Sequence, residues 1–311
     1  MITNIEIQNC LSIVDASVKL SPFTLLIGAN GSGKTNFLQV FTQLSTVAQR
    51  RSQLSIETHV NYQHREQKIT VQNDAEIIYS IPQDYGNPNP IEEISHVKVF
   101  SINPSVVGVN ETITPKPEVK EDGRGIVPVL DALKTGDRED LFEKIERDLG
   151  KYIPEIEKLS FIPVQGGKSL QVREKGLHEP IPVSKLSEGT KFVVAFLTII
   201  HQEFPPTLIC IEEIDRGLHP RLFEKIIQVC FSTTRTEHLP QIIATTHNPY
   251  IVDQFKGHED AVIIVEKTDG ETSFASLAQK TAHLDVMDDD PLGELWFSGF
   301  VGGIPQKGVE H

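Results

Sequence analysis

The chain is poor in the features that mark secreted, membrane-spanning or coiled-coil proteins. It has three cysteines in 311 residues, too few for a disulfide framework, so we expect reduced thiols and a cytoplasmic protein. No apolar stretch reaches the roughly 18 residues that predict a membrane span, and no secretory signal pattern is present. We therefore expect no membrane partner. No heptad repeat is sustained, which argues against a long coiled-coil arm.

Positive charge is also scarce. Asp and Glu number 43 against 29 Lys and Arg, a formal net charge of −14. Proteins built to cover nucleic acid carry a basic excess, so this balance argues against an extended nucleic-acid footprint. A local basic groove and a solvated polar face both remain open for one cluster, which consists of Arg50, Arg51, His64, Arg65 and Lys68.

The first motif that is present is a phosphate loop, GANGSGKT, at residues 28–35, which matches G-x-x-x-x-G-K-[ST]. Its glycines let backbone N–H groups turn toward phosphate oxygens. Lys34 supplies a point charge for the β- and γ-phosphates, and the Thr35 hydroxyl can ligate Mg²⁺. The residues expected to bind the nucleotide here are Gly28, Asn30, Gly31, Gly33, Lys34, Thr35 and Asn36.

The flanking sequence supports this motif. Residues 23–27 form an apolar run typical of a buried strand, and Phe37, Leu38, Phe41 and Leu44 recur at helical spacing after the loop. A helix in this position directs its positive N-terminal end at bound phosphates. The alternative is a glycine-rich turn that binds no ligand, and the order of strand, loop and helix disfavours it.

A second motif, LICIEEIDRGLHP, covers residues 208–220. Its first four residues predict a buried parallel strand, and ligands collect at the carboxyl ends of such strands. Glu212 and Glu213 follow directly, where unpaired charge would be costly to bury. We assign Glu212 to Mg²⁺, directly or through water, and Glu213 to positioning or deprotonating an attacking water. The alternative is a solvated pair just past the strand.

Two shorter motifs complete the set. The turn LSEGT, residues 186–190, precedes a buried helical stretch and offers an anion site from a hydroxyl and N–H groups at a helix N-terminus. Its simpler interpretation is an ordinary N-cap. His247 follows the apolar run 242–246, where a strand-end histidine can hydrogen-bond a γ-phosphate or be merely a satisfied polar residue.

The order of these four motifs resembles the ABC-type ATPase heads of the SMC, RecF and OLD-like group, especially its small stand-alone ATPases. The resemblance implies an α/β fold, that of a P-loop NTPase of ABC-ATPase type, with ATP and Mg²⁺ as cofactors. It also implies a homodimer in which Ser187 and Gly189 contact the γ-phosphate bound by the partner subunit. Within it, Glu212 is the magnesium acid, Glu213 the catalytic carboxylate and His247 the catalytic switch histidine.

The resemblance covers the opening residues 5–13 and the tail 292–300, and it is weak between about residues 50 and 180. We predict an ATPase core at 1–48 and 184–311 and an inserted or flanking α+β lobe at 49–183. Two residues depart from the family pattern. Glu212 stands where Asp is common, and Glu188 replaces a signature glycine, which puts a carboxylate near the phosphates. No glutamine stands out as a magnesium sensor.

Within the lobe, apolar patterns predict several elements. They are strand-like runs over 69–81 and 97–102, a helix over 137–149 that Gly150 ends, and a strand pair at 159–164 and 169–173. We expect the metal-dependent nuclease domain of OLD-type proteins to be absent, because few residues follow the last of the four motifs.

Two functions follow from this sequence. The first is an ATP-hydrolysing homodimeric switch whose shape change is read by DNA or by an effector protein, in genome maintenance or phage defence. The alternative is a regulatory scaffold that binds ATP and scarcely hydrolyses it. A small-molecule kinase would share only the phosphate loop and would need neither LSEGT nor His247.

Overall fold

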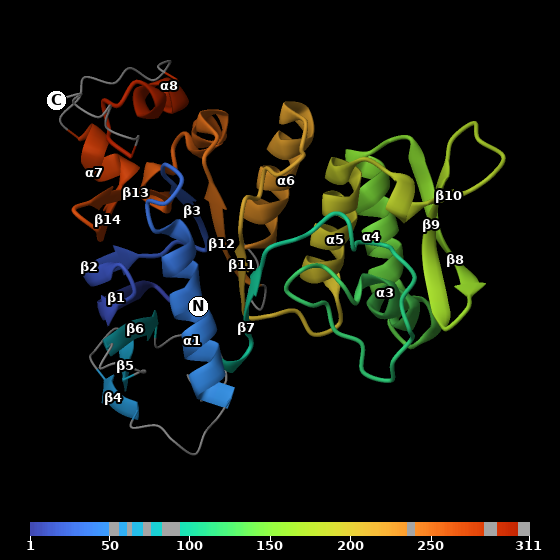
Figure 1. Cartoon of the computed structure of the whole chain (residues 1–311), viewed down its shortest axis with the longest axis horizontal. Helices are drawn as coiled ribbons and strands as arrows, with labels where there is room; N and C mark the ends of the chain where they lie inside the picture. Colours follow the sequence, from blue (N-terminus) through green and yellow to red (C-terminus); the bar gives the residue numbers. More distant parts are fainter. Residues whose placement is uncertain are drawn as a thin grey trace. The chain divides into compact units, whose positions relative to one another are not determined.

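The computed structural model describes two compact units (Figure 1). The first comprises Met1–Val99, Thr207–Ile214 and Cys230–His311, and the second Phe100–Pro206 and Asp215–Val229. The sequence proposes domain boundaries near residues 48 and 184, which differ from the boundaries of these compact units. The proposed domains stay a prediction. The residues that the structure describes are 1–49, 56–60, 64–70, 76–82, 94–234, 240–282 and 291–303.

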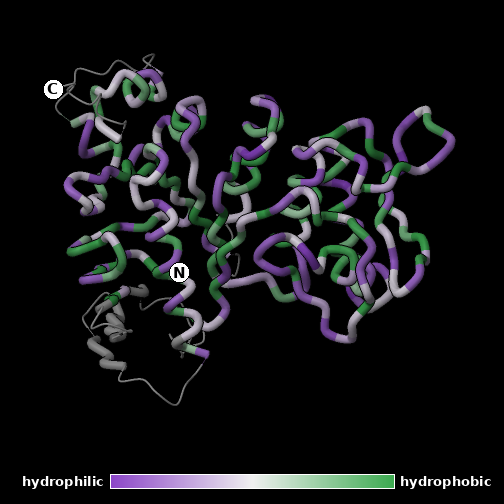
Figure 2. The backbone as a smooth tube through the Cα atoms, viewed as in Figure 1, coloured by the Kyte–Doolittle hydropathy of each residue, from purple (hydrophilic) through white to green (hydrophobic). Residues whose placement is uncertain are grey.

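A six-stranded sheet with the order β14-β13-β3-β12-β11-β7 forms the centre of the first unit. Its strands β3, β11, β12 and β13 are parallel where they pair, which confirms the α/β class. Strands β3, β11 and β12 are buried along their whole length, as parallel strands covered on both faces should be, and the four residues of β11 are all hydrophobic (Figure 2). The strands are β3 (Phe23–Ile27), β7 (Val97–Phe100), β11 (Leu208–Ile211), β12 (Gln241–Thr246), β13 (Val262–Thr268) and β14 (Glu271–Ser276).

A hairpin turn at Asp269 and Gly270 joins β13 to β14, with φ values of 53° and 91°. Two left-handed residues match the twist of the flanking antiparallel strands. The helix predicted after the phosphate loop is α1 (Lys34–Gln49), and the side chains of Phe37, Leu38 and Phe41 are fully buried. The strands predicted at 23–27, 208–211 and 242–246 are thereby confirmed.

A second sheet of the first unit has the order β2-β1-β6-β5-β4. Its side chains and those of α1 share one core with the six-stranded sheet. The run 69–81, expected as one strand-like segment, belongs to two strands, because Ile69 pairs with Ile77 in antiparallel register and the chain must reverse between them. The strands are β1 (Asn4–Cys10), β2 (Ile13–Lys19), β4 (Ile56–Val60), β5 (His64–Thr70) and β6 (Glu76–Pro82). Short helices complete the unit: η3 (Pro249–Phe255), η4 (Glu259–Ala261), α7 (Leu277–Thr281) and α8 (Leu292–Phe297).

The second unit combines helices with a three-stranded antiparallel sheet of order β10-β9-β8. The predicted strand pair is β8 and β9, confirmed with a turn at Gly166. The predicted end of the preceding helix is wrong: the Ile153 N–H still donates to the Leu149 carbonyl, so Gly150 lies inside α4. The elements are α3 (Ile126–Thr135), α4 (Glu139–Tyr152), β8 (Ile156–Val164), β9 (Gly167–Glu174), β10 (Ile181–Pro182), η2 (Val183–Lys185) and α5 (Glu188–His201), and α6 (Pro220–Thr233) begins here.

A buried histidine lies at the contact between α4 and α5. His201 Nε2 is 3.1 Å from Asp148 Oδ2, and the histidine side chain is 8% exposed. Burial, followed by the charge of Lys144 and only partly offset by Asp148, lowers the pKa of His201 to about 4. The imidazole is therefore neutral near pH 7 in the folded protein and becomes protonated more readily in the unfolded chain.

This difference predicts a loss of stability in mild acid. The unfolded chain binds more protons between the unfolded pKa of about 6.5 and the folded pKa of about 4, so the free energy of unfolding falls as pH drops through that window. Relative to His201→Gln, the wild type should lose up to about 3 kcal/mol between pH 7 and pH 4. Urea unfolding at several pH values measures this. Exposed His219, replaced by Gln, is the control and should follow the wild type, whereas parallel curves for wild type and His201→Gln would contradict the prediction.

Candidate functional site

The ends of three parallel strands bring the predicted site residues of the first unit together. The register pairs Ile211 with Ala244 and Thr246 with Ile27. The phosphate loop, the Glu212–Glu213 pair and His247 therefore all follow the same edge of the sheet, where ligands of parallel sheets bind. Segments separated by about two hundred residues meet here because their strands pair.

The Lys34 ammonium is turned into the phosphate loop. It donates to the carbonyl oxygens of Gly28 at 2.7 Å and Ala29 at 2.8 Å. Burial lowers the pKa of Lys34, and the nearby carboxylate of Glu213 acts in the opposite direction. Lys34 and Glu213 are thus close enough to interact electrostatically, although Lys34 begins α1 and Glu213 lies in the turn after β11. A phosphate anion can replace the two carbonyls as the partner of this ammonium.

The glycines of the phosphate loop occupy different structural surroundings. A Cβ on Gly28 would collide with the Val265 carbonyl of β13. Gly33, at φ 108°, lies directly against the side chain of Thr272. Gly31, at φ 77°, has open space where its Cβ would be, so its backbone is accessible to a ligand. The loop therefore has a tightly packed back and an open front, a backbone arrangement that suits an anion.

Glu213 has a left-handed backbone with φ 50°. Its N–H donates to Thr245 Oγ1 at 3.0 Å, and the next N–H, that of Ile214, donates to the Thr245 carbonyl at 3.1 Å. A left-handed non-glycine residue costs roughly 1–2 kcal/mol, which these contacts and the burial of Ile214 must offset. The turn leaves the Glu213 side chain exposed just beyond β11. Strain of this kind is often found at functional sites.

His247 and Asn248 follow β12 with different roles. The His247 side chain is exposed. Asn248 donates its N–H to Thr246 Oγ1 at 3.0 Å, and its side-chain oxygen accepts from the Tyr250 N–H at 3.1 Å. Asn248 thus caps η3 and fixes the backbone next to the histidine. The sequence analysis did not identify Thr245 and Thr246 as residues that support the site. The feature that could have indicated them is a pair of threonines at the end of a predicted buried strand.

The donors suited to Mg²⁺ are few. Thr35 is exposed in the first turn of α1, and Glu212 is half-buried directly after β11. Among the described residues no group of three or more His, Cys, Asp or Glu side chains could hold a metal ion. Mg²⁺ is usually held by one or two carboxylates while substrate phosphates and water supply the other ligands. Thr35 and Glu212 fit an ion of that kind, bound together with a nucleotide.

The LSEGT turn belongs to the second unit and starts α5. Ser187 Oγ accepts from the Thr190 N–H at 3.2 Å and lies 2.9 Å from Thr190 Oγ1, so Ser187 is the N-cap of the helix. A Cβ on Gly189 would collide with the carbonyl of Gly217, which explains this glycine by packing within the subunit. A contact of Ser187 and Gly189 with a nucleotide of a second subunit stays a prediction.

Asn36 and the basic cluster complete the predicted residues. Asn36 donates its side-chain amide to Ser12 Oγ at 2.6 Å, and Asn30 is exposed at the front of the loop. Arg50 and Arg51 lie outside the described residues, and the structure places only the backbone of the other three basic residues. Among the described residues no helix combines the length and apolar character needed to cross a membrane.

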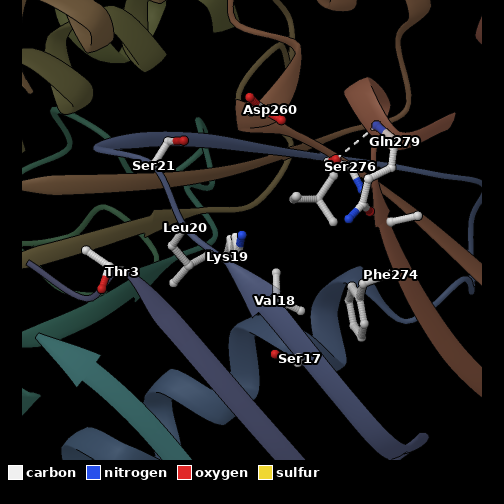
Figure 3. Close-up of a pocket in the computed structure, with 12 residues that line it drawn as sticks. Thr3, Ser17, Val18, Lys19, Leu20, Ser21, Asp260, Phe274, Ser276 and Gln279 are labelled. Carbon is white, nitrogen blue, oxygen red and sulfur yellow. Dashed lines mark hydrogen bonds between the residues drawn. The ribbon is translucent and has the colours of Figure 1, made fainter. Parts of the chain in front are cut away.

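Two pockets lie near these elements in the first unit. One of about 340 Å³ lies between residues 29–32, residues 265–269 and Gly303. There the Gly303 carbonyl accepts from the Ala29 N–H at 2.9 Å, while its N–H donates to Glu266 at 3.0 Å. The other, of about 540 Å³, lies between β2, β14 and α7 and is lined by Lys19 and Asp260 among others (Figure 3). Neither pocket is lined by Lys34 or by the residues that follow β11 and β12.

Comparison with known proteins defines the class. The model of a family described as "AAA domain, putative AbiEii toxin, Type IV TA system" matches residues 23–95 and 61–253. These matches cover most of the chain, which therefore belongs to this family. A comparison with curated proteins found no match.

Three solved structures are similar to this chain. The Pyrococcus furiosus Smc head domain, solved with an extended coiled coil and bound to the C-terminal domain of ScpA, is 15% identical with a TM-score of 0.50, over 90% of this chain and 97% of that chain. The Thermotoga maritima SMC head domain is 14% identical with a TM-score of 0.48, over 88% and 98%. Clostridium perfringens cbiO1, part of the ABC transporter complex cbiONQ, is 16% identical with a TM-score of 0.45, over 91% and 92%. The Pyrococcus furiosus match shows that the protein has the fold of an SMC head domain, within the class of ATPase heads that the motif order predicted.

The two loop glycines provide a test of this packing. Gly28→Ala should cost about 2–3 kcal/mol, because the new methyl group meets the rigid Val265 carbonyl. Gly31→Ala should cost only about 1 kcal/mol, the penalty of a left-handed alanine in open space. Thermal unfolding of both variants without nucleotide measures the difference. Equal melting temperatures would show that β13 does not confine the loop at Gly28.

Proposed function

We propose that this protein binds and hydrolyses Mg-ATP and acts as a homodimeric ATP switch. The observation that carries the proposal is the meeting of Lys34, Glu213 and His247 at one edge of the parallel sheet. The open front of the phosphate loop and membership of the AAA-domain family support a nucleotide ligand.

The residues divide the chemistry among themselves. Lys34 exchanges its two carbonyl partners for oxygens of the β- and γ-phosphates, while Thr35 and Glu212 hold Mg²⁺, which neutralises phosphate charge when bound. Glu213 orients a water and takes its proton as the water oxygen bonds to the γ-phosphorus. The bond from that phosphorus to the β–γ bridging oxygen breaks, and ADP and phosphate are released. His247 hydrogen-bonds the γ-phosphate.

The second subunit completes the site in this proposal. Ser187 Oγ accepts from the Thr190 N–H and lies 2.9 Å from Thr190 Oγ1, where either hydroxyl can donate, so the Ser187 proton is available to a phosphate oxygen when Thr190 is the donor. The N-terminus of α5 adds partial positive charge, which favours a phosphate oxygen at this position. Glu188, at the first residue of α5, adds negative charge that opposes the contact. ATP sandwiched between the phosphate loop of one subunit and Ser187 and Gly189 of its partner closes the dimer, and hydrolysis opens it.

The output of the switch is a shape change transmitted to an effector protein or to DNA. The two proposed roles are phage defence and genome maintenance, and the family description names a putative toxin of a type IV toxin–antitoxin system. The alternative function is a regulatory scaffold that binds ATP with little hydrolysis. Glu188 favours this alternative, because repulsion of the phosphates would weaken the closed dimer in which hydrolysis occurs.

Replacing the proposed catalytic carboxylate separates the two functions. Glu213→Gln keeps the shape of the side chain but removes its basicity, so kcat should fall at least about 100-fold while Mg-ATP still binds. Lys34→Ala should lose nucleotide binding itself, because the phosphates lose their main point charge. Phosphate release and calorimetric titration measure the two effects. Wild-type hydrolysis no faster than that of Lys34→Ala would favour the scaffold.

The dimer is tested by mass in solution. In the Glu213→Gln background, sedimentation should show a monomer without nucleotide and a dimer with Mg-ATP, and Ser187→Ala should abolish the shift. Ser276→Ala is a matched control, since Ser276 caps α7 with the same 3.2 Å bond from a backbone N–H. A mass that ignores nucleotide, or equal effects of the two substitutions, would contradict the role of Ser187.

A further inference from the structure

A chain of hydrogen bonds between side chains runs behind the phosphate loop. The Asn36 amide donates to Ser12 Oγ at 2.6 Å, and Ser12 Oγ lies 2.7 Å from Thr272 Oγ1. Thr272 Oγ1 in turn donates to the carbonyl oxygen of Ser32 at 3.1 Å. The chain links α1, the turn between β1 and β2, strand β14 and the loop, all within the first unit. Thr272 belongs to no motif identified in the sequence, and Ser12 lies in the opening segment 5–13, outside the four nucleotide-binding motifs.

The two ends of this chain determine its direction. The amide nitrogen of Asn36 can only donate, and the carbonyl of Ser32 can only accept. Thr272 has one hydroxyl proton, which it gives to Ser32, so it must accept from Ser12. Each hydroxyl therefore accepts one bond and donates one, and the proton positions are set without ambiguity. Removing either hydroxyl leaves the next group without its partner.

Thr272 also forms the surface against which the loop packs. Its side chain is 3% exposed, and its N–H donates to the Ser12 carbonyl at 2.8 Å, which holds the strand against the β1–β2 turn. A Cβ on Gly33 would collide with the Thr272 side chain. Packing against Thr272 therefore requires a glycine at position 33, whether or not a phosphate also approaches the loop there. Loop backbone and threonine are in direct contact, with no room between them.

The carbonyl of Ser32 and the N–H of Gly33 belong to one planar peptide group. Because a trans peptide directs its oxygen and its hydrogen to opposite sides, the bond from Thr272 to the oxygen directs the Gly33 N–H away from Thr272. N–H groups of a phosphate loop bind the anion, so their orientation sets the affinity. Without this bond the peptide could rotate, and binding would have to order it.

We propose that Thr272 and Ser12 are positioning residues that preorganise the phosphate loop for the nucleotide. The proposal rests on the proposed function, since it takes the phosphates of ATP as the ligand. Neither residue touches the phosphates in this role. They act through the peptide between Ser32 and Gly33, and Asn36 anchors the far end of the hydrogen-bond chain on α1.

Thr272→Val is the decisive variant, because valine keeps the shape that contacts Gly33 and removes the hydroxyl. In the Glu213→Gln background, the Kd for Mg-ATP should rise about three- to tenfold, the effect of one lost hydrogen bond. Thr272→Ser should restore the affinity. In a wild-type background kcat at saturating ATP should stay within about twofold, because the loop holds phosphate equally in the ground and transition states.

Thr24→Val is the matched control. Thr24 is fully buried in β3, and among the described residues its hydroxyl bonds the backbone of Ser21, at the end of the strand away from the loop. This substitution should lower the melting temperature and leave the Kd unchanged. Amide hydrogen exchange of residues 31–34 without nucleotide provides a second measurement, in which Thr272→Val should exchange faster than Thr24→Val.

The outcomes separate this inference from the proposed function. A Kd and exchange rates for Thr272→Val that equal those of Thr24→Val would overturn the positioning role while ATP binding by the parent protein stands. A parent protein that does not bind Mg-ATP would overturn the proposed function, and the exchange rates would still decide whether Thr272 orders the loop. If Thr272→Val does not fold, Ser12→Ala is the substitute variant, because it interrupts the same chain of hydrogen bonds at a less buried position.

Discussion

The parallel pairing of β3, β12 and β11 is the constraint on which the rest of this structure depends. Each strand is short and buried along its whole length, and each can satisfy its backbone groups in a buried position only beside the others. Parallel strands cannot be joined by tight turns, so long crossovers must separate them. Pairing therefore brings three distant segments to one edge, and the polar residues that end each strand meet there.

Packing behind this edge shapes the phosphate loop. The Val265 carbonyl of β13 excludes a side chain at Gly28, and Thr272 of β14 excludes one at Gly33. The Lys34 ammonium donates hydrogen bonds to two loop carbonyls and interacts electrostatically with the Glu213 carboxylate at the ends of the strands. The loop is confined from behind and accessible in front, so a ligand finds donors that are already oriented. Preorganisation of this kind reduces the entropy lost on binding.

The second unit stabilises its own elements by other means. Helices α4 and α5 meet at the buried His201 and the half-buried Asp148, and the LSEGT turn is closed by a serine cap and by glycine packing against Gly217. The same turn thus has a complete structural explanation within one subunit. Structural and functional interpretations of Ser187 are compatible when Thr190 Oγ1 donates to Ser187 Oγ, because the cap then uses the oxygen lone pairs and a phosphate contact would use the Ser187 proton.

The sequence by itself determined the buried strands, the phosphate loop, the helix that follows it and the acidic strand end, because each depends on residue types at fixed local spacing. It missed the reversal between Ile69 and Ile77 and the continuation of α4 past Gly150, where pairing and packing override local signals. Only the tertiary structure decided that Glu213 has a left-handed backbone conformation with its N–H bonded to Thr245 Oγ1. The same holds for the position of Thr272 behind the phosphate loop. Those contacts join residues 32 and 240 positions apart, and they arise from how the strands pair and pack rather than from any neighbouring residue.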